Sequence, residues 1–145
     1  MGKQEAIARG RLYRKRLGGG MRQAGILAAS GLIALEEMPR RLPEDHGNAQ
    51  YLAQELSQLK GIEIDPSKVV TNIVIFDIAG TGMSATDFSA KLKERGVLMN
   101  GIGGSLIRAV THYDADRSAC EAAIAAIRAL SSRMPSRSGG RLASS

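Results

Sequence analysis

A run of three glycines, Gly18-Gly19-Gly20, divides the first part of this chain into two dissimilar segments. Residues 3–17 are polar and basic, whereas Ala24–Leu35 contains no charged residue and is mostly apolar. Because glycine runs end helices and form turns, the pattern predicts a basic helix over 3–17, a glycine turn, and an apolar helix over 21–38. A helix that is apolar on nearly every side needs cover on several faces. We therefore expect other polypeptide, including polypeptide outside this chain, to pack on it.

Basic residues flank the glycine turn on both sides. Arg14, Lys15 and Arg16 come directly before it, and Arg22 follows it. Backbone N–H groups freed by a glycine turn at a helix N-terminus, together with positive side chains, hold phosphate and carboxylate groups. Lys15 and Arg22 are candidates to converge on one anion. The alternative, a plain turn between two helices with both side chains in solvent, stays open.

The rest of the chain predicts a small sheet with helices. A third helix follows Pro43 to about Lys60, and Gly61 stands in the position of its C-cap. Ser84 resembles the N-cap of a short helix that ends at Gly96, and Asp116 can cap a last helix. Strands are predicted in four apolar or β-branched runs, which are 62–64, 71–78, 97–100 and 105–111, the last two around the turn Gly101-Ile102-Gly103-Gly104.

This order of elements, helices followed by β-β-α-β-β-α, predicts an α/β domain whose sheet is covered by helices on one face. We expect a helical segment over 1–40, an α/β domain over 41–132 and a disordered tail over 133–145, where no apolar pattern remains.

The positive charge lies at the two ends of the chain. Residues 1–22 carry seven Lys and Arg against one Glu, and residues 133–145 carry three Arg and no acid, out of a net charge of +6. The middle of the chain is therefore mildly acidic. Three Tyr, two Phe and no Trp leave few rings on which bases could stack. We expect no nucleic-acid partner.

A single cysteine, Cys120, cannot form an internal disulfide, and no Cys or His cluster has metal-ligand spacing, so no metal site is predicted. Its place in an Ala and Ile run favours a buried core residue. The apolar stretch Ala24–Leu35 is too short to cross a bilayer, and the basic N-terminus lacks the form of a signal peptide. We expect a soluble, cytoplasmic protein without a membrane partner.

One charged residue, Arg108, stands within the apolar run Ser105–Val110. An unpaired buried guanidinium is costly, and its planar fork matches a carboxylate in two parallel hydrogen bonds. An internal ion pair and a bound substrate anion are equally compatible with this pattern. We expect His46 and His112 to be surface or capping residues and Asp77 to be a strand-end acid, since no nucleophile stands at a recognisable spacing from the histidines.

Several separated blocks resemble the C-terminal part of the low-specificity L-threonine aldolases. They occur in the same order over roughly residues 5–130 and are Arg14–Ala29, Asp45–Ala49, Thr71–Val74, Gly96–Leu98 and Ile107–His112. The resemblance implies the C-terminal small domain of a pyridoxal 5'-phosphate (PLP) enzyme of fold type I, usually a homotetramer built as a dimer of dimers. Such enzymes cleave L-threonine or L-allo-threonine, which are β-hydroxy amino acids, to glycine and acetaldehyde.

The resemblance also implies residue roles. Arg108 takes the position of the arginine that binds the substrate α-carboxylate, and Lys15 and Arg22 take positions that reach the cofactor across a subunit interface. The family's Schiff-base lysine belongs to a Ser-Lys-Gly motif upstream of the glycine turn, and Lys3 does not stand in such a motif. We therefore expect no catalytic residue in this chain and no activity from the chain alone. The alternatives are a truncated oligomerisation module and a PLP lyase for another β-hydroxy amino acid.

Overall fold

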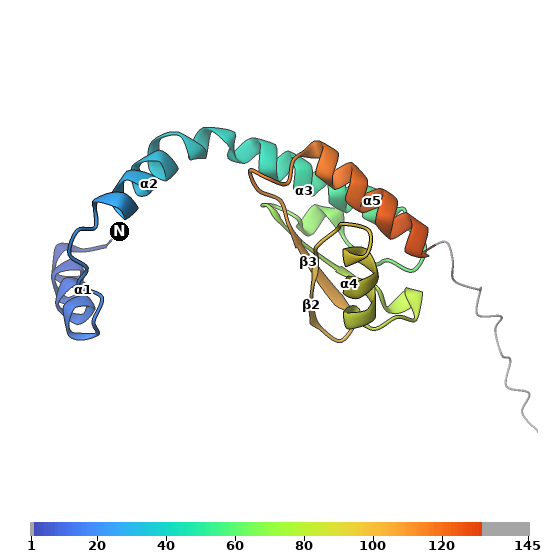
Figure 1. Ribbon diagram of the computed structural model, residues 1–145, viewed down its shortest axis with the longest axis horizontal. Coiled ribbons are helices and arrows are strands. Elements are labelled where there is room, and N and C mark those ends of the chain that lie inside the picture. Colours follow the sequence, from blue (N-terminus) through green and yellow to red (C-terminus); the bar gives the residue numbers. More distant parts are fainter. Residues whose placement is uncertain (1, 132–145) are drawn as a thin grey trace, which may run out of the picture. The chain divides into compact units, whose positions relative to one another are not determined.

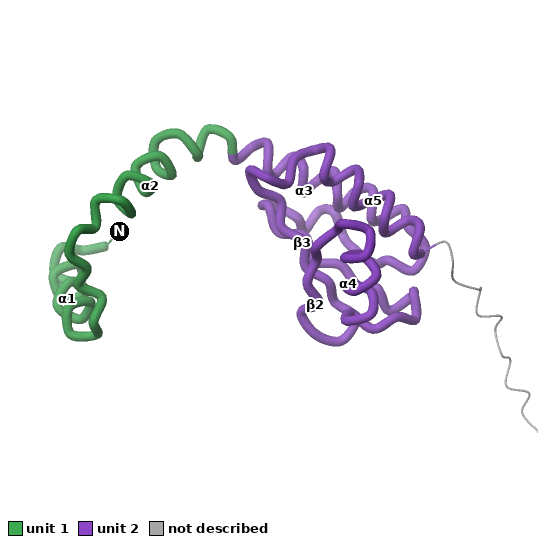
Figure 2. Tube along the Cα trace, viewed as in Figure 1, with its two compact units in different colours: residues 1–41 green, residues 42–145 purple. Residues whose placement is uncertain are grey.

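The computed structural model describes residues 2–131, which form two compact units that meet in sequence between Arg41 and Leu42 (Figure 2). The tail predicted to be disordered, 133–145, lies outside the described residues. None of the described helices combines the length and the apolar character that a bilayer span requires.

The first unit is helical. It contains α1 (Gln4–Arg16), α2 (Gly25–Glu36) and a short 3₁₀ helix, η1 (Met38–Arg41). The first helix was predicted over nearly the same residues. The second begins four residues later than predicted, because Met21–Ala24 form a bend. No residue of α2 is buried, and Ile26 and Leu35 expose 84% and 76% of their surface. Within the described residues, no other segment therefore buries the apolar side chains of α2.

The second unit is a mixed helix and strand domain. Figure 1 shows its elements, which are α3 (Leu42–Ser57), the 3₁₀ helices η2 (Pro66–Lys68) and η3 (Ala79–Thr81), β1 (Ile73–Asp77), α4 (Ala85–Lys93), β2 (Asn100–Gly103), β3 (Leu106–Val110) and α5 (Arg117–Ser131). Pro43 stands in the first turn of α3, where a missing N–H costs nothing. Ser84 caps α4 by accepting from the N–H of Asp87, as predicted.

The three strands form an antiparallel sheet in the order β1-β3-β2. Residues alternate between its faces, so Val74 and Phe76 of β1 are buried with Ile107 and Ala109 of β3. This inner face packs on the helices and carries the hydrophobic core, which includes Leu52, Leu56, Phe88, Leu92, Ile124 and Ile127. The prediction of a sheet covered by helices is confirmed for this face.

Two strand predictions were wrong in detail. The segment 62–64 forms only an isolated bridge, in which Glu63 and Asp77 exchange backbone hydrogen bonds of 2.8 and 2.9 Å. The glycines predicted as a turn, Gly101 and Gly103, lie in β2 instead of beyond a strand at 97–100. A Cβ on Gly101 would stand 2.8 Å from the Cβ of Ala85, so the strand needs glycine there in order to approach α4.

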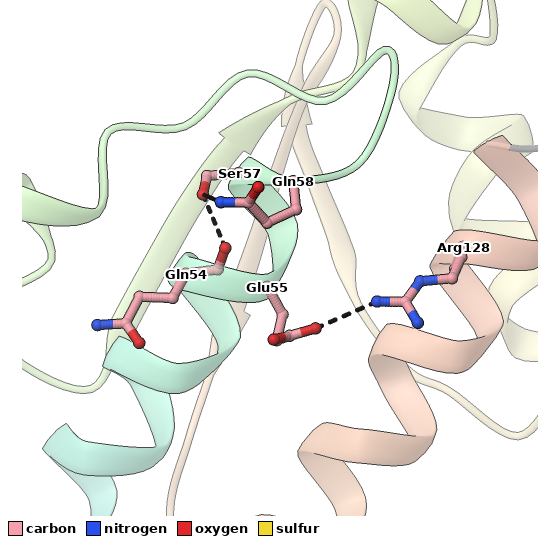
Figure 3. Close-up of polar contacts among 5 residues, drawn as sticks. All are labelled: Gln54, Glu55, Ser57, Gln58 and Arg128. Carbon is pink, nitrogen blue, oxygen red and sulfur yellow. Dashed lines mark hydrogen bonds and ion pairs between the residues drawn. The ribbon is translucent and has the colours of Figure 1, made fainter.

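An ion pair joins the two long helices of this unit. Arg128 of α5 donates to the carboxylate of Glu55 on α3 at 3.1 Å (Figure 3). Both side chains are partly in solvent, so the pair contributes little energy beside the apolar contacts between the same helices.

Candidate functional site

Arg108 lies in the middle of β3, on the face of the sheet opposite the core. Its neighbours in the chain, Ile107 and Ala109, point into the core, whereas Arg108 is exposed. Its register partners are Ile75 on β1 and Asn100 on β2, and residues directly opposite one another in an antiparallel sheet project from the same face. Within residues 2–131, Arg108 has no ion-pair partner, so the internal ion pair that the sequence left open is not formed there.

The face around Arg108 is largely apolar. Ile73, Ile75, Leu106 and Val110 stand on it, and each exposes between 40% and 47% of its surface. A guanidinium set among apolar side chains binds an anion more strongly once the face is covered, since the surrounding dielectric falls. The exposed face therefore combines one cation, which has no ion-pair partner among residues 2–131, with apolar surface that excludes water when another layer packs on it.

Polar contacts at the end of β3 fix the strand beside this face. The hydroxyl of Thr111 donates to the main-chain oxygen of Asp45 in α3 at 2.7 Å. Asn72 donates its side-chain N–H to the oxygen of Thr111 at 2.9 Å, and the N–H of Thr111 donates to the oxygen of Asn72 at 3.0 Å. Thr111 and Asp45 expose only 2% and 6% of their surface. Sequence reasoning assigned no role to these residues, although polar residues at the ends of apolar strands are a signal for such contacts.

The glycine turn closes the C-terminal end of α1 and does not begin α2. Gly18 has a φ of +79° and follows the C-cap of α1. The N–H of Gly18 donates to the oxygen of Lys15 at 3.2 Å, and that of Gly19 donates to the oxygen of Arg14 at 2.8 Å. These two N–H groups close the helix end. The predicted opening of the glycines directly into the apolar helix is wrong, since α2 begins at Gly25.

Lys15 and Arg22 both lie in the first unit and are exposed. Lys15 runs along the glycine turn, because a Cβ on Gly20 would stand 2.8 Å from its Cδ and 3.2 Å from its Nζ. Arg22 stands in the bend before α2. In the described part of the chain neither side chain has an ion-pair partner. Both cations are therefore free to meet an anion supplied from outside the unit.

The two histidines differ in setting. His46 is half-buried in the first turns of α3. His112 is exposed after β3, and its Nδ1 accepts the N–H of Asp114 at 3.2 Å. This contact closes a local turn.

The pKa values of the Asp77 carboxyl and the Cys120 thiol differ from their ordinary values, and each shift has a local cause. A hydrogen bond from Ser105 and the N–H of Ala79, at 2.7 Å, hold the pKa of the Asp77 carboxyl below its ordinary value. Burial raises the pKa of the Cys120 thiol, which lies on α5. Cys120 also lines an apolar cavity of about 200 Å³ beside Met99 and Ala109. It is a core residue, in agreement with the sequence.

A larger cavity, of about 610 Å³, lies beside β1. Its walls include Ile73, Ile75 and Asp77 of that strand, and Glu63, Asp65 and Lys68 of the segment before it.

Comparison with known proteins identifies the family. The family model of the beta-eliminating lyases matches residues 1–79. The low-specificity L-threonine aldolase 1 of Arabidopsis thaliana is 40% identical over 114 residues, which are 78% of this chain and 32% of that protein. The low specificity L-threonine aldolase of Escherichia coli (strain K12) is 38% identical over 117 residues, 81% of this chain and 33% of the relative.

A third relative is named for a different activity. The alanine racemase TOXG of Cochliobolus carbonum is 32% identical over 132 residues, which are 86% of this chain and 32% of that protein. The chain thus spans about a third of the length of the curated relatives it matches. Through the family model, which covers more than half of its residues, the chain belongs to the beta-eliminating lyase family.

Proposed function

We propose that this chain forms the C-terminal part of a PLP-dependent aldolase that cleaves L-threonine or L-allo-threonine to glycine and acetaldehyde. In this proposal the chain is the small domain of a fold type I enzyme, preceded by helices of the large domain or the subunit interface. One observation carries the proposal. Arg108 stands exposed and without an ion-pair partner among residues 2–131, at the centre of an apolar sheet face.

The relatives support a role for Arg108 in holding a carboxylate. L-threonine and alanine, which the names of two relatives contain, differ in their side chains but share the α-carboxylate. Both relatives match a segment that includes most of this chain. A guanidinium holds a carboxylate through two parallel hydrogen bonds, which fix its plane as well as its position. In this proposal Arg108 binds the group that both substrates share.

The residues of the chain fit the periphery of PLP. Lys15 and Arg22 are exposed cations without ion-pair partners in the described part, and such cations suit the cofactor phosphate. None of the six lysines is buried, and each is exposed at the surface of its own unit. Burial lowers the pKa of a lysine and so favours its reaction with a cofactor carbonyl. The chain therefore offers phosphate and carboxylate contacts, and we propose that the covalent attachment comes from other polypeptide.

Bound PLP supplies the electron sink for the pair released when the Cα–Cβ bond breaks. The residues of this chain act by position. Arg108 holds the α-carboxylate and so sets the direction of the Cα–Cβ bond. Ile75 and Leu106 beside it keep water from the carboxylate once the face is covered, which strengthens the ion pair.

The first experiment tests the isolated chain. We expect the 145-residue chain, mixed with PLP and L-threonine, to release acetaldehyde no faster than PLP alone. Steady release above that background would contradict the assignment of the catalytic lysine to other polypeptide.

The second experiment tests Arg108 in a complete enzyme. This chain replaces the matching segment of the Escherichia coli relative, and the chimera is assayed with L-threonine. Arg108→Met should lower kcat/KM about 100-fold, the effect of losing one charge-assisted pair of about 3 kcal/mol. Arg108→Lys should recover only part of the loss, since it cannot form the two parallel bonds. The control Arg95→Met changes an exposed arginine just after α4, whose side chain donates to the oxygen of Lys91.

Equal kcat/KM values for Arg108→Met and Arg95→Met in a folded chimera would remove the role proposed for Arg108. The aldolase assignment would then rest on similarity alone.

The exposed apolar surface of α2 supports a further part of the proposal, assembly as a homo-oligomer. Leu27, Leu32 and Ile33 each expose more than half of their surface, and a helix of this composition is stable in water only when other polypeptide covers it. Sedimentation of the chimera tests this. A monomer at micromolar concentration would contradict the dimer of dimers.

A further inference from the structure

The outer edge of β1 carries backbone groups that no strand pairs. Asp77 exchanges both of its backbone hydrogen bonds with Glu63, so its N–H and C=O point away from β3. Polar groups of a strand alternate in direction along it, so those of Ile75 and Ile73 point to the same outer side. The N–H of Ile78 donates to the oxygen of Ser105, which confirms this alternation, because the backbone groups of the even-numbered residues of this segment point to β3. Within residues 2–131, the outward groups of Ile73 and Ile75 have no hydrogen-bond partner.

The segment after Glu63 leaves the strand instead of continuing the ladder. Asp65 accepts the N–H of Ser67 at 3.0 Å and begins the 3₁₀ helix η2, whose first residue, Pro66, has no N–H to donate. Gln50 of α3 donates its amide to the oxygens of Pro66 and Val69, which holds this loop at a distance from β1. The cavity of about 610 Å³ lies between the loop and the strand edge.

The cavity is acidic. Glu63, Asp65 and Asp77 line it together with a single cation, Lys68, which stands 3.5 Å from Asp65. Hydrogen bonds from Ser67 lower the pKa of Asp65, and those described above lower that of Asp77, so both carboxylates stay charged at neutral pH. Three negative charges against one positive charge favour a basic occupant.

We propose that the outer edge of β1 and the adjoining cavity bind an extended, basic segment of another polypeptide as an added strand. The backbone groups of Ile73 and Ile75 supply the main-chain pairing, and Glu63 and Asp65 receive a Lys or Arg side chain of the segment. An extended segment of about five residues spans about 17 Å, which covers the length of β1. This inference is independent of the proposed catalytic function and requires no cofactor.

The test uses the full 145-residue chain and a synthetic peptide, acetyl-Val-Lys-Val-Lys-Val-amide. Binding is measured by calorimetry, and the amide protons of β1 are followed by NMR. We expect binding that protects the amides of Ile73 and Ile75 from exchange. Two positional isomers of the doubly N-methylated peptide provide matched controls, one methylated at the second and fourth residues and one at the third and fifth. Only one set of N–H groups can face β1, so the two isomers should differ about tenfold in affinity.

A variant of the chain tests the main-chain hydrogen bonding between the peptide and β1 through a change in β1 instead of in the peptide. Ile75→Pro removes an outward N–H and leaves the β1 to β3 ladder intact, a substitution that edge strands accept. It should weaken peptide binding about fivefold, as the loss of one hydrogen bond predicts, whereas Ile75→Val should bind as the parent does. Glu63→Gln, which leaves the backbone unchanged, should weaken binding of the lysine peptide but not of its glutamine analogue.

Absence of peptide binding, equal affinities for the two methylated isomers, or unchanged affinity in both Ile75→Pro and Glu63→Gln would each overturn the proposal. So would sedimentation showing that the chain without peptide self-associates and that Ile75→Pro abolishes this, because the edge would then belong to a second copy.

Discussion

Thr111 and Asp45 join the end of the central strand to the first turns of α3, through a 2.7 Å hydrogen bond from a buried hydroxyl to a main-chain oxygen. Thr111→Val keeps the shape of the side chain and removes this bond. We expect the free energy of unfolding to fall by about 1–2 kcal/mol, because the oxygen of Asp45 loses a buried donor.

Urea unfolding of the chain measures this loss. Thr71→Val is the matched control, since Thr71 is exposed and its hydroxyl makes no hydrogen bond to the described residues. That variant should change the unfolding free energy by less than about 0.5 kcal/mol. Equal effects at positions 71 and 111 would show that the hydrogen bond contributes nothing.

Gly80 and Gly47 should respond to the same substitution with opposite signs. A Cβ on Gly80 would stand 2.7 Å from the Cα of Gly61, so Gly80→Ala forces two backbone segments apart and should cost about 1–3 kcal/mol. Gly47 lies within α3, and a Cβ there would meet open space, with nothing within 4 Å. Gly47→Ala should therefore stabilise the fold by about 0.5–1 kcal/mol. Thermal unfolding of the two variants tests both predictions. A stabilised Gly80→Ala would contradict the close approach of Gly80 to Gly61.

Local signals in the sequence predicted most of the helices. Ser84 and Asp116 cap α4 and α5 as their positions suggested, and Gly96 adopts a positive φ just after α4. The prediction of Gly61 as the C-cap of the third helix was wrong, since α3 ends at Ser57, although Gly61 does adopt a positive φ. Caps and helix-ending glycines depend on only a few neighbouring residues, so they can be recognised in the sequence without knowledge of the fold.

Contacts between distant segments could not be predicted in the same way. Gly101 was assigned to a turn because glycine usually marks one, but it lies in β2, where Ala85 of another element leaves no room for a Cβ. For the same reason, the alternation of residues 106–110 placed Arg108 on a strand but did not decide whether it would be paired. That depended on which residues β1 and β2 bring beside it, and these are Ile75 and Asn100, which carry no charge.

Asp77 makes the stability of the domain depend on pH. Hydrogen bonds from Ser105 and from the N–H of Ala79 favour its ionised form and lower its pKa in the folded chain. A group whose pKa is lower in the folded state stabilises the fold above its unfolded pKa and loses this contribution as the pH falls through the folded value. The difference in unfolding free energy between the parent and Asp77→Asn should therefore be constant from about pH 5 to 7 and shrink below about pH 4. Urea unfolding from about pH 2 to 7 measures it, and a difference that stays constant over this whole range would count against the role of Asp77.

Cys120 should react slowly with thiol reagents while the domain is folded. It exposes 4% of its surface, and burial raises the pKa of its thiol, so both access and the thiolate fraction are reduced at about pH 8. If modification requires opening of α5, a bulky maleimide should label the native chain at least about 100-fold more slowly than the chain in urea. A Cys120→Ala, Ser118→Cys double variant moves the thiol to an exposed position on the same helix and should be labelled quickly in both conditions. Native labelling of Cys120 at the rate of this control would mean that α5 opens readily, and the core that it shares with Leu52 and Ala109 would then be less stable than its packing indicates.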